Sequence, residues 1–258
     1  MSESLRKPRR LGVGVAPDAR GALRVVFVLG DAFFEHERRP TAPLGAVLDE
    51  ALSGRFAADL AARAIEDPAR SGLRAIERPT AFAPPFDMNR PFKILALGRS
   101  YRAHALELGN APVERPLVFA KFADCAVGAG ATVTIPDDAE GKMDHEAELA
   151  FVLGADAANL AAGEGRSKIA GFFPSVDLTL RVVQSKAKAS GHPWLGAKNF
   201  PGAFPVGPWI TPASAVASPE SLEIRCTVNG VERQRESVGA MTWDVGRVVE
   251  EMSRLWPL

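Results

Sequence analysis

The 258-residue sequence predicts an α+β fold in which a small N-terminal α/β unit precedes a larger unit rich in strands. Apolar runs on both sides of a Pro-Asp-Ala-Arg-Gly turn predict a β-hairpin over residues 11–35. Apolar residues then recur at helical spacing across residues 43–66. A proline-rich stretch at residues 79–91 has the composition of a linker, so we place a small first domain at residues 1–90 and a second domain at residues 91–258.

The larger unit contains a series of predicted strands and ends in a predicted helix. Short apolar runs indicate strands at residues 92–98, 117–121, 146–154, 169–173 and 206–210. The Asn229-Gly230 dipeptide is the strongest short signal for a β-hairpin, and it lies within residues 222–234. Apolar residues at helical spacing predict an amphipathic helix over residues 241–256.

The composition is that of an ordinary globular protein, with 47% apolar and 24% charged residues. The formal net charge is zero, so we predict neither nucleic acid nor an anionic membrane as a partner. Cys125 and Cys226 lie too far apart in sequence to indicate a disulfide framework or a zinc knuckle, and we expect a reducing compartment, the cytoplasm. No apolar run is long enough to cross a membrane.

Glu146 and Glu148 begin one of the predicted strands. Because strand side chains repeat their direction every second residue, both carboxylates point to the same face. Two close carboxylates repel each other, and a divalent cation between them relieves that repulsion. All-oxygen ligation favours Mg²⁺, Mn²⁺ or Ca²⁺ over zinc. The alternative is a solvated edge strand with two surface glutamates.

Asp177 follows another apolar run and precedes a helical pattern. It is either the N-cap of that helix or a third ligand of the metal. Arg181 and Gln184 would then follow on one face of the helix, in a position to hold an anionic substrate. Lys198 lies in a short segment with glycine and aromatic residues, where it is either a solvated loop charge or a donor to a substrate oxygen.

His104 and Glu107 are three residues apart in a predicted short helix over residues 99–109, so they share one helical face. A carboxylate beside an imidazole raises its basicity and fixes its orientation, which suits a general base. The alternative is a pair of surface side chains.

Four motifs, taken together and in this order, resemble the fumarylacetoacetate hydrolase family over roughly residues 92–256. They are residues 98–107 (GRSYRAHALE), 144–149 (DHEAEL), 177–184 (DLTLRVVQ), and 196–200 (GAKNF) with 206–209 (VGPW). The resemblance implies a mixed β-sandwich roll preceded by a small N-terminal domain, and a homodimer. It also implies that Mg²⁺ or Mn²⁺ is held by Glu146, Glu148 and Asp177.

The same resemblance implies roles for the remaining candidates. Catalytic roles fall to His104, Glu107 and Lys198. The predicted substrate-binding residues are Tyr101, Lys121, Arg181 and Gln184. Family substrates are β-diketo or acylpyruvate-type acids, so the expected partner is a small 2-oxo acid, and family reactions include C–C bond hydrolysis, decarboxylation and isomerisation.

We therefore predict a divalent-metal-dependent hydrolase that cleaves a C–C bond in an acylpyruvate- or fumarylacetoacetate-like acid. The metal would stabilise the leaving enolate, and His104, oriented by Glu107, would deprotonate a water. Lys198 would supply positive charge where the oxyanion develops. The alternatives are a decarboxylase or isomerase of related 2-oxo acids, and a non-catalytic metal- or ligand-binding protein that retains the fold.

The sequence departs from the family pattern at three places. Ser100 stands where asparagine is common, and Val182 stands where aspartate is usual, which predicts the loss of local polar support rather than of the metal. The family pattern continues past the last helix with a strand and a Thr-Gly-Thr-Pro-type loop. This sequence ends at Leu258, before that segment, whose loss would expose a sheet edge and apolar surface. We expect either a truncated sequence, a partner chain that fills the gap, or a protein that keeps the fold without full activity.

Overall fold

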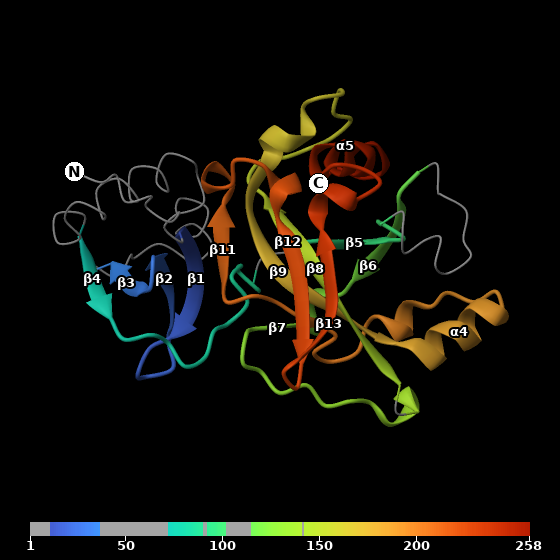
Figure 1. The fold of residues 1–258 in the computed structure, drawn as a ribbon, viewed down its shortest axis with the longest axis horizontal. Coiled ribbons are helices and arrows are strands. Elements are labelled where there is room, and N and C mark those ends of the chain that lie inside the picture. Colours follow the sequence, from blue (N-terminus) through green and yellow to red (C-terminus); the bar gives the residue numbers. More distant parts are fainter. Residues whose placement is uncertain (1–10, 37–71, 90–91, 102–114, 141) are drawn as a thin grey trace.

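The computed structural model describes residues 11–36, 72–89, 92–101, 115–140 and 142–258. Its main feature is a seven-stranded sheet with the strand order β4-β3-β2-β1-β11-β9-β8 (Figure 1). In chain order these strands are β1 (Leu11–Pro17), β2 (Leu23–Leu29), β3 (Ala32–His36), β4 (Leu73–Ile76), β8 (Met143–Leu153), β9 (Ile169–Leu180) and β11 (Trp209–Pro212).

The predicted N-terminal hairpin is confirmed. β1 and β2 pair antiparallel from Leu11 opposite Leu29 to Pro17 opposite Leu23. The Asp18 carboxylate closes the turn by accepting hydrogen bonds from the backbone N–H groups of Arg20 and Ala22, at 2.8 and 2.9 Å. β3 and β4 extend the hairpin into an antiparallel meander. The helix predicted over residues 43–66 lies outside the described residues.

The N-terminal strands share their sheet with a strand from far along the chain. β1 pairs antiparallel with β11, with Val13 opposite Ile210 and Gly14 opposite Trp209. A Cβ atom at Gly14 would lie 2.5 Å from the Pro208 carbonyl oxygen, so this close approach requires glycine. The domain boundary at residues 90 and 91 stays a prediction, and the two predicted units are joined by one continuous sheet.

The predicted strands of the larger unit are confirmed, with shifted bounds. β8 and β9 form the longest pair, and three shorter pairs lie around them. These are β5 (Ile94–Gly98) with β6 (Leu117–Lys121), β7 (Ala126–Val127) with β10 (Phe204–Pro205), and β12 (Glu223–Val228) with β13 (Val231–Ser237). The β12–β13 hairpin turns at Asn229 and Gly230, whose φ angles are 51° and 79°.

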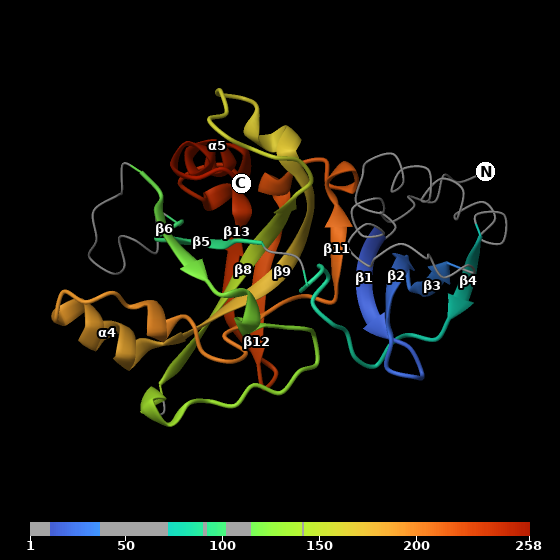
Figure 2. The same ribbon diagram turned by 180° about the vertical axis from the view of Figure 1, so that it is seen from behind.

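Two α-helices lie in the described part of the chain, and Figure 2 shows them at opposite ends of the β8–β9 pair. α4 (Arg181–Ala189) continues directly from β9. α5 (Val245–Leu255) starts later than predicted because Asp244 caps it by accepting a hydrogen bond from the Arg247 N–H at 3.0 Å. Val245 and Val249 pack α5 against β9. None of the described helices has the length and apolarity needed to cross a membrane.

Candidate metal centre

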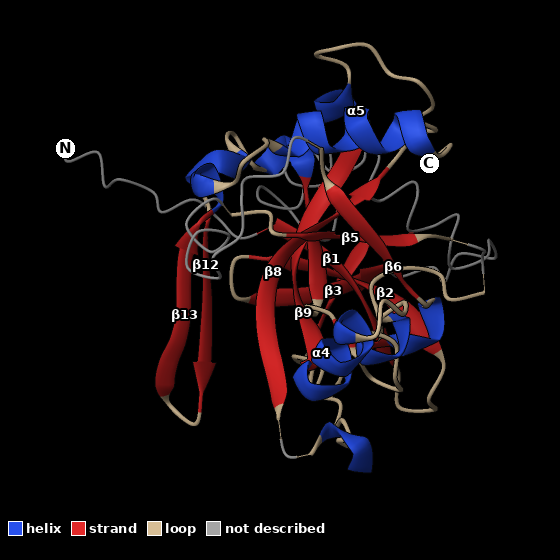
Figure 3. Ribbon diagram, turned by 90° about the vertical axis from the view of Figure 1, so that its right-hand side faces the viewer, coloured by secondary structure: helices blue, strands red, loops and turns tan. Residues whose placement is uncertain are grey.

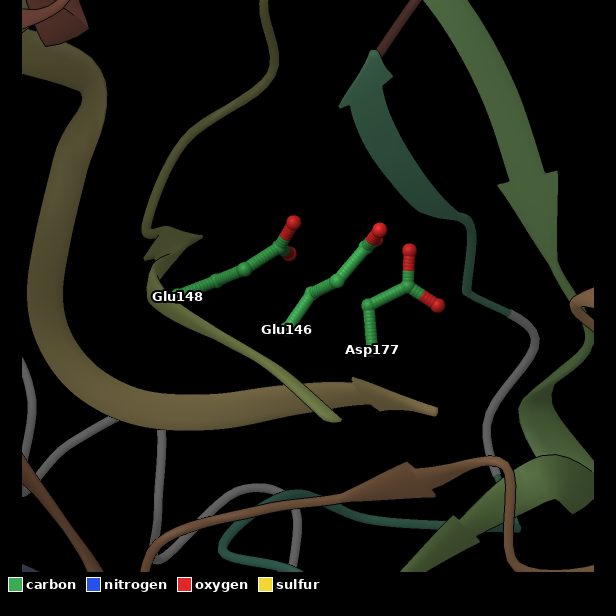
Figure 4. A group of neighbouring side chains, drawn as sticks. All are labelled: Glu146, Glu148 and Asp177. Atoms are coloured by element: carbon green, nitrogen blue, oxygen red, sulfur yellow. The ribbon is translucent and has the colours of Figure 1, made fainter. Parts of the chain in front are cut away.

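Glu146, Glu148 and Asp177 project from one face of the β8–β9 pair toward a common point (Figure 4). The two glutamates are two residues apart on β8, and Asp177 lies directly opposite Glu146 on β9. Their ligand oxygens all lie within 4.8 Å of one another. The N-cap alternative for Asp177 is wrong, because β9 continues past it and α4 has Leu180 at its N-cap position.

Two buried lysines contact these carboxylates. The Lys198 ammonium lies 2.7 Å from Glu146 Oε2 and 2.5 Å from Asp177 Oδ2. The Lys121 ammonium donates to Asp177 Oδ1 at 2.7 Å and to the Lys198 carbonyl at 2.6 Å. Lys121 therefore ties the aspartate to the loop that carries the second lysine. The solvated-loop alternative for Lys198 is wrong, since its side chain is only 3% exposed.

The local charges shift the pKa values of the two glutamates in opposite directions. Burial acts to raise the pKa of Glu146, but Lys198 and Arg181 outweigh it and hold that pKa below its usual range. Burial, followed by the negative charges of Asp177 and Glu146, raises the pKa of Glu148 to about 8. An added positive charge would therefore stabilise the ionised form of Glu148 more than that of Glu146.

The residues present fit a hard divalent cation. Three carboxylates supply only oxygen atoms, the donor set that Mg²⁺, Mn²⁺ and Ca²⁺ prefer. Ser175 lies opposite Glu148 on β9, and its buried hydroxyl has no hydrogen-bond partner within the described residues. An unsatisfied hydroxyl beside a carboxylate of raised pKa is a site that a cation, or a water or substrate oxygen on it, would complete.

Arg181 forms the outer side of the centre. Its guanidinium donates to Asp144 Oδ2 at 2.7 Å, to Gln184 Oε1 at 2.6 Å and to Glu146. The guanidinium is about one-third exposed, whereas Gln184 is buried behind it. Arg181 therefore lies at the rim of the centre with Gln184 beneath it, and the predicted contact of both residues with substrate stays a prediction.

The β12–β13 hairpin supports the edge of β8 between the two glutamates (Figure 3). The Gln234 side chain accepts a hydrogen bond from the Ala147 N–H and donates one to the Ala147 carbonyl, both at 2.8 Å. One side-chain amide thereby takes the place of a neighbouring strand. Sequence reasoning missed this residue, because nothing local in the sequence marks a pairing between positions so far apart.

A cavity of about 830 Å³ lies between β5, β8 and α5, and apolar side chains make up most of its wall. Tyr101, Glu148 and Ser175 are among its polar lining residues. Burial and the nearby carboxylates of Glu148 and Glu236 raise the pKa of Tyr101 to about 12, so the phenol stays a hydrogen-bond donor at neutral pH. The catalytic pair predicted at His104 and Glu107 lies outside the described residues.

The structure thus brings most of the predicted site residues into one region. Glu146, Glu148 and Asp177 form its centre, and Lys198 and Arg181 contact them directly. Lys121 lies on the buried side of Asp177, away from solvent, and its predicted contact with substrate stays a prediction.

A family model described as "Fumarylacetoacetate (FAA) hydrolase C-terminal" matches residues 93–258. The chain belongs to the fumarylacetoacetate hydrolase family. Members named as oxaloacetate tautomerases are similar in sequence. The mitochondrial fahd-1 of Caenorhabditis elegans is 32% identical over 170 residues, which are 66% of this chain and 78% of that protein. YcgM of Escherichia coli is 32% identical over 166 residues, which are 64% of this chain and 75% of that protein.

Solved structures of the family share the fold. The fumarylpyruvate hydrolase of Pseudomonas aeruginosa, solved with Mn²⁺ and pyruvate, is 30% identical with a TM-score of 0.61, over 72% of this chain and 82% of that chain. The fumarylacetoacetate hydrolase of Exiguobacterium antarcticum, at 20% identity, has a TM-score of 0.74 over 96% of this chain and 83% of that chain. The α+β fold of the fumarylacetoacetate hydrolase type, predicted from the sequence, is confirmed.

Proposed function

We propose that this chain is a divalent-metal-dependent enzyme that converts a 2-oxo acid through its enolate, and that keto–enol tautomerisation is its principal reaction. The observation that carries the proposal is the group of three carboxylates on β8 and β9 with Lys198 beside two of them. A divalent cation held there would polarise the carboxylate and keto oxygens of a 2-oxo acid and lower the free energy of the enolate.

The chain's own residues supply the remaining requirements. Lys198 places an ammonium group beside the carboxylates, where negative charge develops on the keto oxygen during enolisation. Tautomerisation moves one proton between C3 and the oxygen on C2 and adds or removes no other atom. His104, oriented by Glu107, remains our predicted base for that proton. Arg181 and Gln184, at the rim, remain the predicted contacts of the substrate's carboxylate.

Hydrolysis of a C–C bond in an acylpyruvate is the second candidate. Similarity to the fumarylpyruvate hydrolase of Pseudomonas aeruginosa favours it, whereas relatives named as oxaloacetate tautomerases favour the first candidate. The two reactions share the enolate and differ in whether water attacks a second carbonyl. Mg²⁺ or Mn²⁺, with Ca²⁺ as a third option, is the proposed cofactor, and a homodimer is the proposed assembly.

One set of assays separates the candidates. Oxaloacetate would be followed for keto–enol conversion and for pyruvate formation by decarboxylation, and acetylpyruvate for pyruvate release by hydrolysis. Each assay would be run with Mn²⁺, with chelator, and with Glu148→Ala beside the exposed control Glu232→Gln. We expect metal-dependent keto–enol conversion that only Glu148→Ala abolishes. Absence of metal-dependent turnover in all three assays, by a folded protein that binds Mn²⁺, would contradict the proposal.

A further inference from the structure

Lys198, one of the two lysines of the metal centre, is carried by a segment that is neither strand nor α-helix. It follows a single 3₁₀ turn at Leu195–Ala197, and its N–H donates to the Leu195 carbonyl at 3.1 Å. Because the lysine side chain is a flexible four-carbon stem, the place of its ammonium group depends on how firmly this backbone is held. The Lys121 side chain supplies one tie, through its hydrogen bond to the Lys198 carbonyl.

The Asn199 side-chain amide supplies a second tie between the two segments that carry the lysines. Its oxygen accepts a hydrogen bond from the Phe122 N–H at 2.6 Å, and its nitrogen donates to the Ala120 carbonyl at 3.1 Å. These two backbone groups flank Lys121, the last residue of β6. The same nitrogen donates to the Leu195 carbonyl at 3.0 Å. One amide therefore joins the backbone on both sides of the first lysine to the turn before the second.

An amide suits this position because it donates and accepts at once. It meets an N–H with its oxygen and two carbonyls with its nitrogen, as the backbone of a neighbouring strand would. The Cys125 thiol, 3.7 Å from the amide oxygen, is a weak donor and adds little. Every backbone group that Asn199 contacts either adjoins Lys121 or already accepts from the Lys198 N–H. The amide therefore acts on the placement of these two lysines.

That placement decides what Lys198 can do in the site. Its ammonium lies 2.7 Å from Glu146 Oε2 and 2.5 Å from Asp177 Oδ2. A charge that stabilises a developing oxyanion must be in place before the reaction, and a shift of about 1 Å removes much of its effect. A loop held at one point less would let the ammonium group move by such a distance.

We propose that Asn199 is a positioning residue, which holds the Lys198 ammonium where it meets the negatively charged oxygen of the enolate. This inference rests on the proposed function, which places that oxygen on the cation beside Lys198. Asn199 acts through Lys198 and takes no part in proton transfer.

Oxalate and pyruvate test this inference without any turnover. Oxalate is planar and carries a negatively charged oxygen where the enolate of a 2-oxo acid has one, whereas pyruvate has a neutral keto oxygen there. The readout is the Kd of each compound for the Mn²⁺-loaded protein, measured by calorimetry. The variants are Asn199→Ala, Lys198→Met and the protein with both substitutions.

Ser253→Ala is the control for a purely structural loss. The Ser253 hydroxyl accepts a hydrogen bond from the Leu160 N–H at 3.0 Å, on α5 and outside the metal centre. Its loss should lower stability and leave both Kd values unchanged. A thermal unfolding curve shows that each variant is folded in the assay. If Asn199→Ala is not, Asn199→Ser takes its place, because the shorter serine side chain cannot span the two segments.

We expect Asn199→Ala to weaken oxalate binding by about tenfold and pyruvate binding by less than about twofold, because only oxalate presents a charged oxygen to Lys198. Lys198→Met should show the same selectivity with a larger loss. The double variant should bind oxalate no more weakly than Lys198→Met alone, the pattern of a residue that acts through another. The inference is overturned by losses that multiply in the double variant, by equal losses for both compounds, by an oxalate affinity that Asn199→Ala leaves unchanged, by an equal loss in Ser253→Ala, or by a wild type that does not bind oxalate.

The assays of the proposed function separate its failure from failure of this inference. If no tautomerisation occurs but Asn199→Ala weakens oxalate binding only when Lys198 is present, the proposed reaction is wrong and the positioning role stands. If tautomerisation occurs but the two losses multiply, the positioning role is wrong and the proposed reaction stands. With both correct, Asn199→Ala should lower kcat for oxaloacetate and leave KM within about twofold, because the lost interaction belongs to the enolate-like state.

Discussion

The two sides of the metal centre contain ion pairs of the same length in very different surroundings. Lys121 and Asp177 are 2.7 Å apart with side chains 0% and 1% exposed. Arg181 and Asp144 are also 2.7 Å apart, but their side chains are 36% and 49% exposed. Water screens the outer pair and is excluded from the inner one. The distance between the charges therefore does not predict how much each ion pair stabilises the fold. Losing a charge should destabilise the protein more on the inner side than on the outer side.

The largest effect on stability is expected for Lys121→Met on the inner side. This substitution removes the only charge on Asp177 Oδ1 among the described residues and the donor to the Lys198 carbonyl. We expect the free energy of unfolding to fall by about 3 kcal/mol, because Asp177 stays buried with Lys198 as its one remaining cationic partner among the described residues. Urea unfolding in the presence of chelator measures it. A loss below about 1 kcal/mol would mean that the two sides do not differ.

The next effect is the pH dependence of the stability of the metal-free protein. With the pKa of Glu148 raised to about 8 from the ordinary 4.5, the folded chain keeps a proton that the unfolded chain has lost. Stability therefore falls as pH rises through this window, by up to about 1.4 kcal/mol per pH unit, and Glu148→Gln should flatten the slope. Urea unfolding at several pH values checks this, and an unchanged slope in the variant would contradict it.

The proton on Glu148 should also make metal binding depend on pH. Cation binding must displace it from Glu148, so the Mn²⁺ affinity should rise about tenfold per pH unit below pH 8 and then level off. Calorimetry in buffers of different ionisation enthalpy would count the released proton. An affinity independent of pH between 6 and 8 would show that Glu148 is already ionised.

A smaller effect is expected for Gln234→Ala, which acts on the edge of β8. Both backbone polar groups of Ala147 would lose their side-chain partner, at a cost of about 1–3 kcal/mol. Because Ala147 lies between two ligands, Mn²⁺ binding should also weaken by about tenfold. Arg233→Ala, at the neighbouring exposed position of β13, is the matched control and should change neither quantity. Equal effects of the two substitutions would show that the amide has no special role.

The smallest effect on stability is expected for Arg181→Met on the outer side. Its ion pairs with Asp144 and Glu146 are open to solvent, and the buried Gln184 loses one donor, so the free energy of unfolding should fall by about 1 kcal/mol. The KM for the 2-oxo acid should nevertheless rise, if Arg181 meets the substrate as predicted. A stability loss as large as that of Lys121→Met would remove the distinction between the two sides.

Local patterns in the sequence predicted part of the metal centre, whereas the contacts between distant segments could not be predicted. Glu146 and Glu148 were predicted as a pair because the twofold repeat of a strand places them on one face. The register that sets Asp177 opposite Glu146 is a long-range property of β8 and β9, and residue spacing left the N-cap alternative open. The burial of Lys121 likewise depends on the loop around Lys198, which is distant in sequence.

One miss did have a local signal. The later start of α5 could have been predicted, because Asp244 directly precedes the helix and aspartate is a preferred N-cap residue. The pairing of β1 with β11 had no such signal, because the two strands lie at opposite ends of the sequence. Most of the longer strands were predicted, since their apolar runs and their Gly and Asn turn residues are local features, whereas the short strands β4 and β7 were not.

The central claim is that Glu146, Glu148 and Asp177 bind a divalent cation, and a calorimetric titration with Mn²⁺ tests it most directly. Wild-type protein, Glu148→Gln and the exposed control Glu232→Gln would be titrated at pH 8, where about half of Glu148 is ionised. We predict one Mn²⁺ per chain for the wild type and Glu232→Gln, and binding at least 100-fold weaker or undetectable for Glu148→Gln. Equal binding by all three proteins would contradict the account.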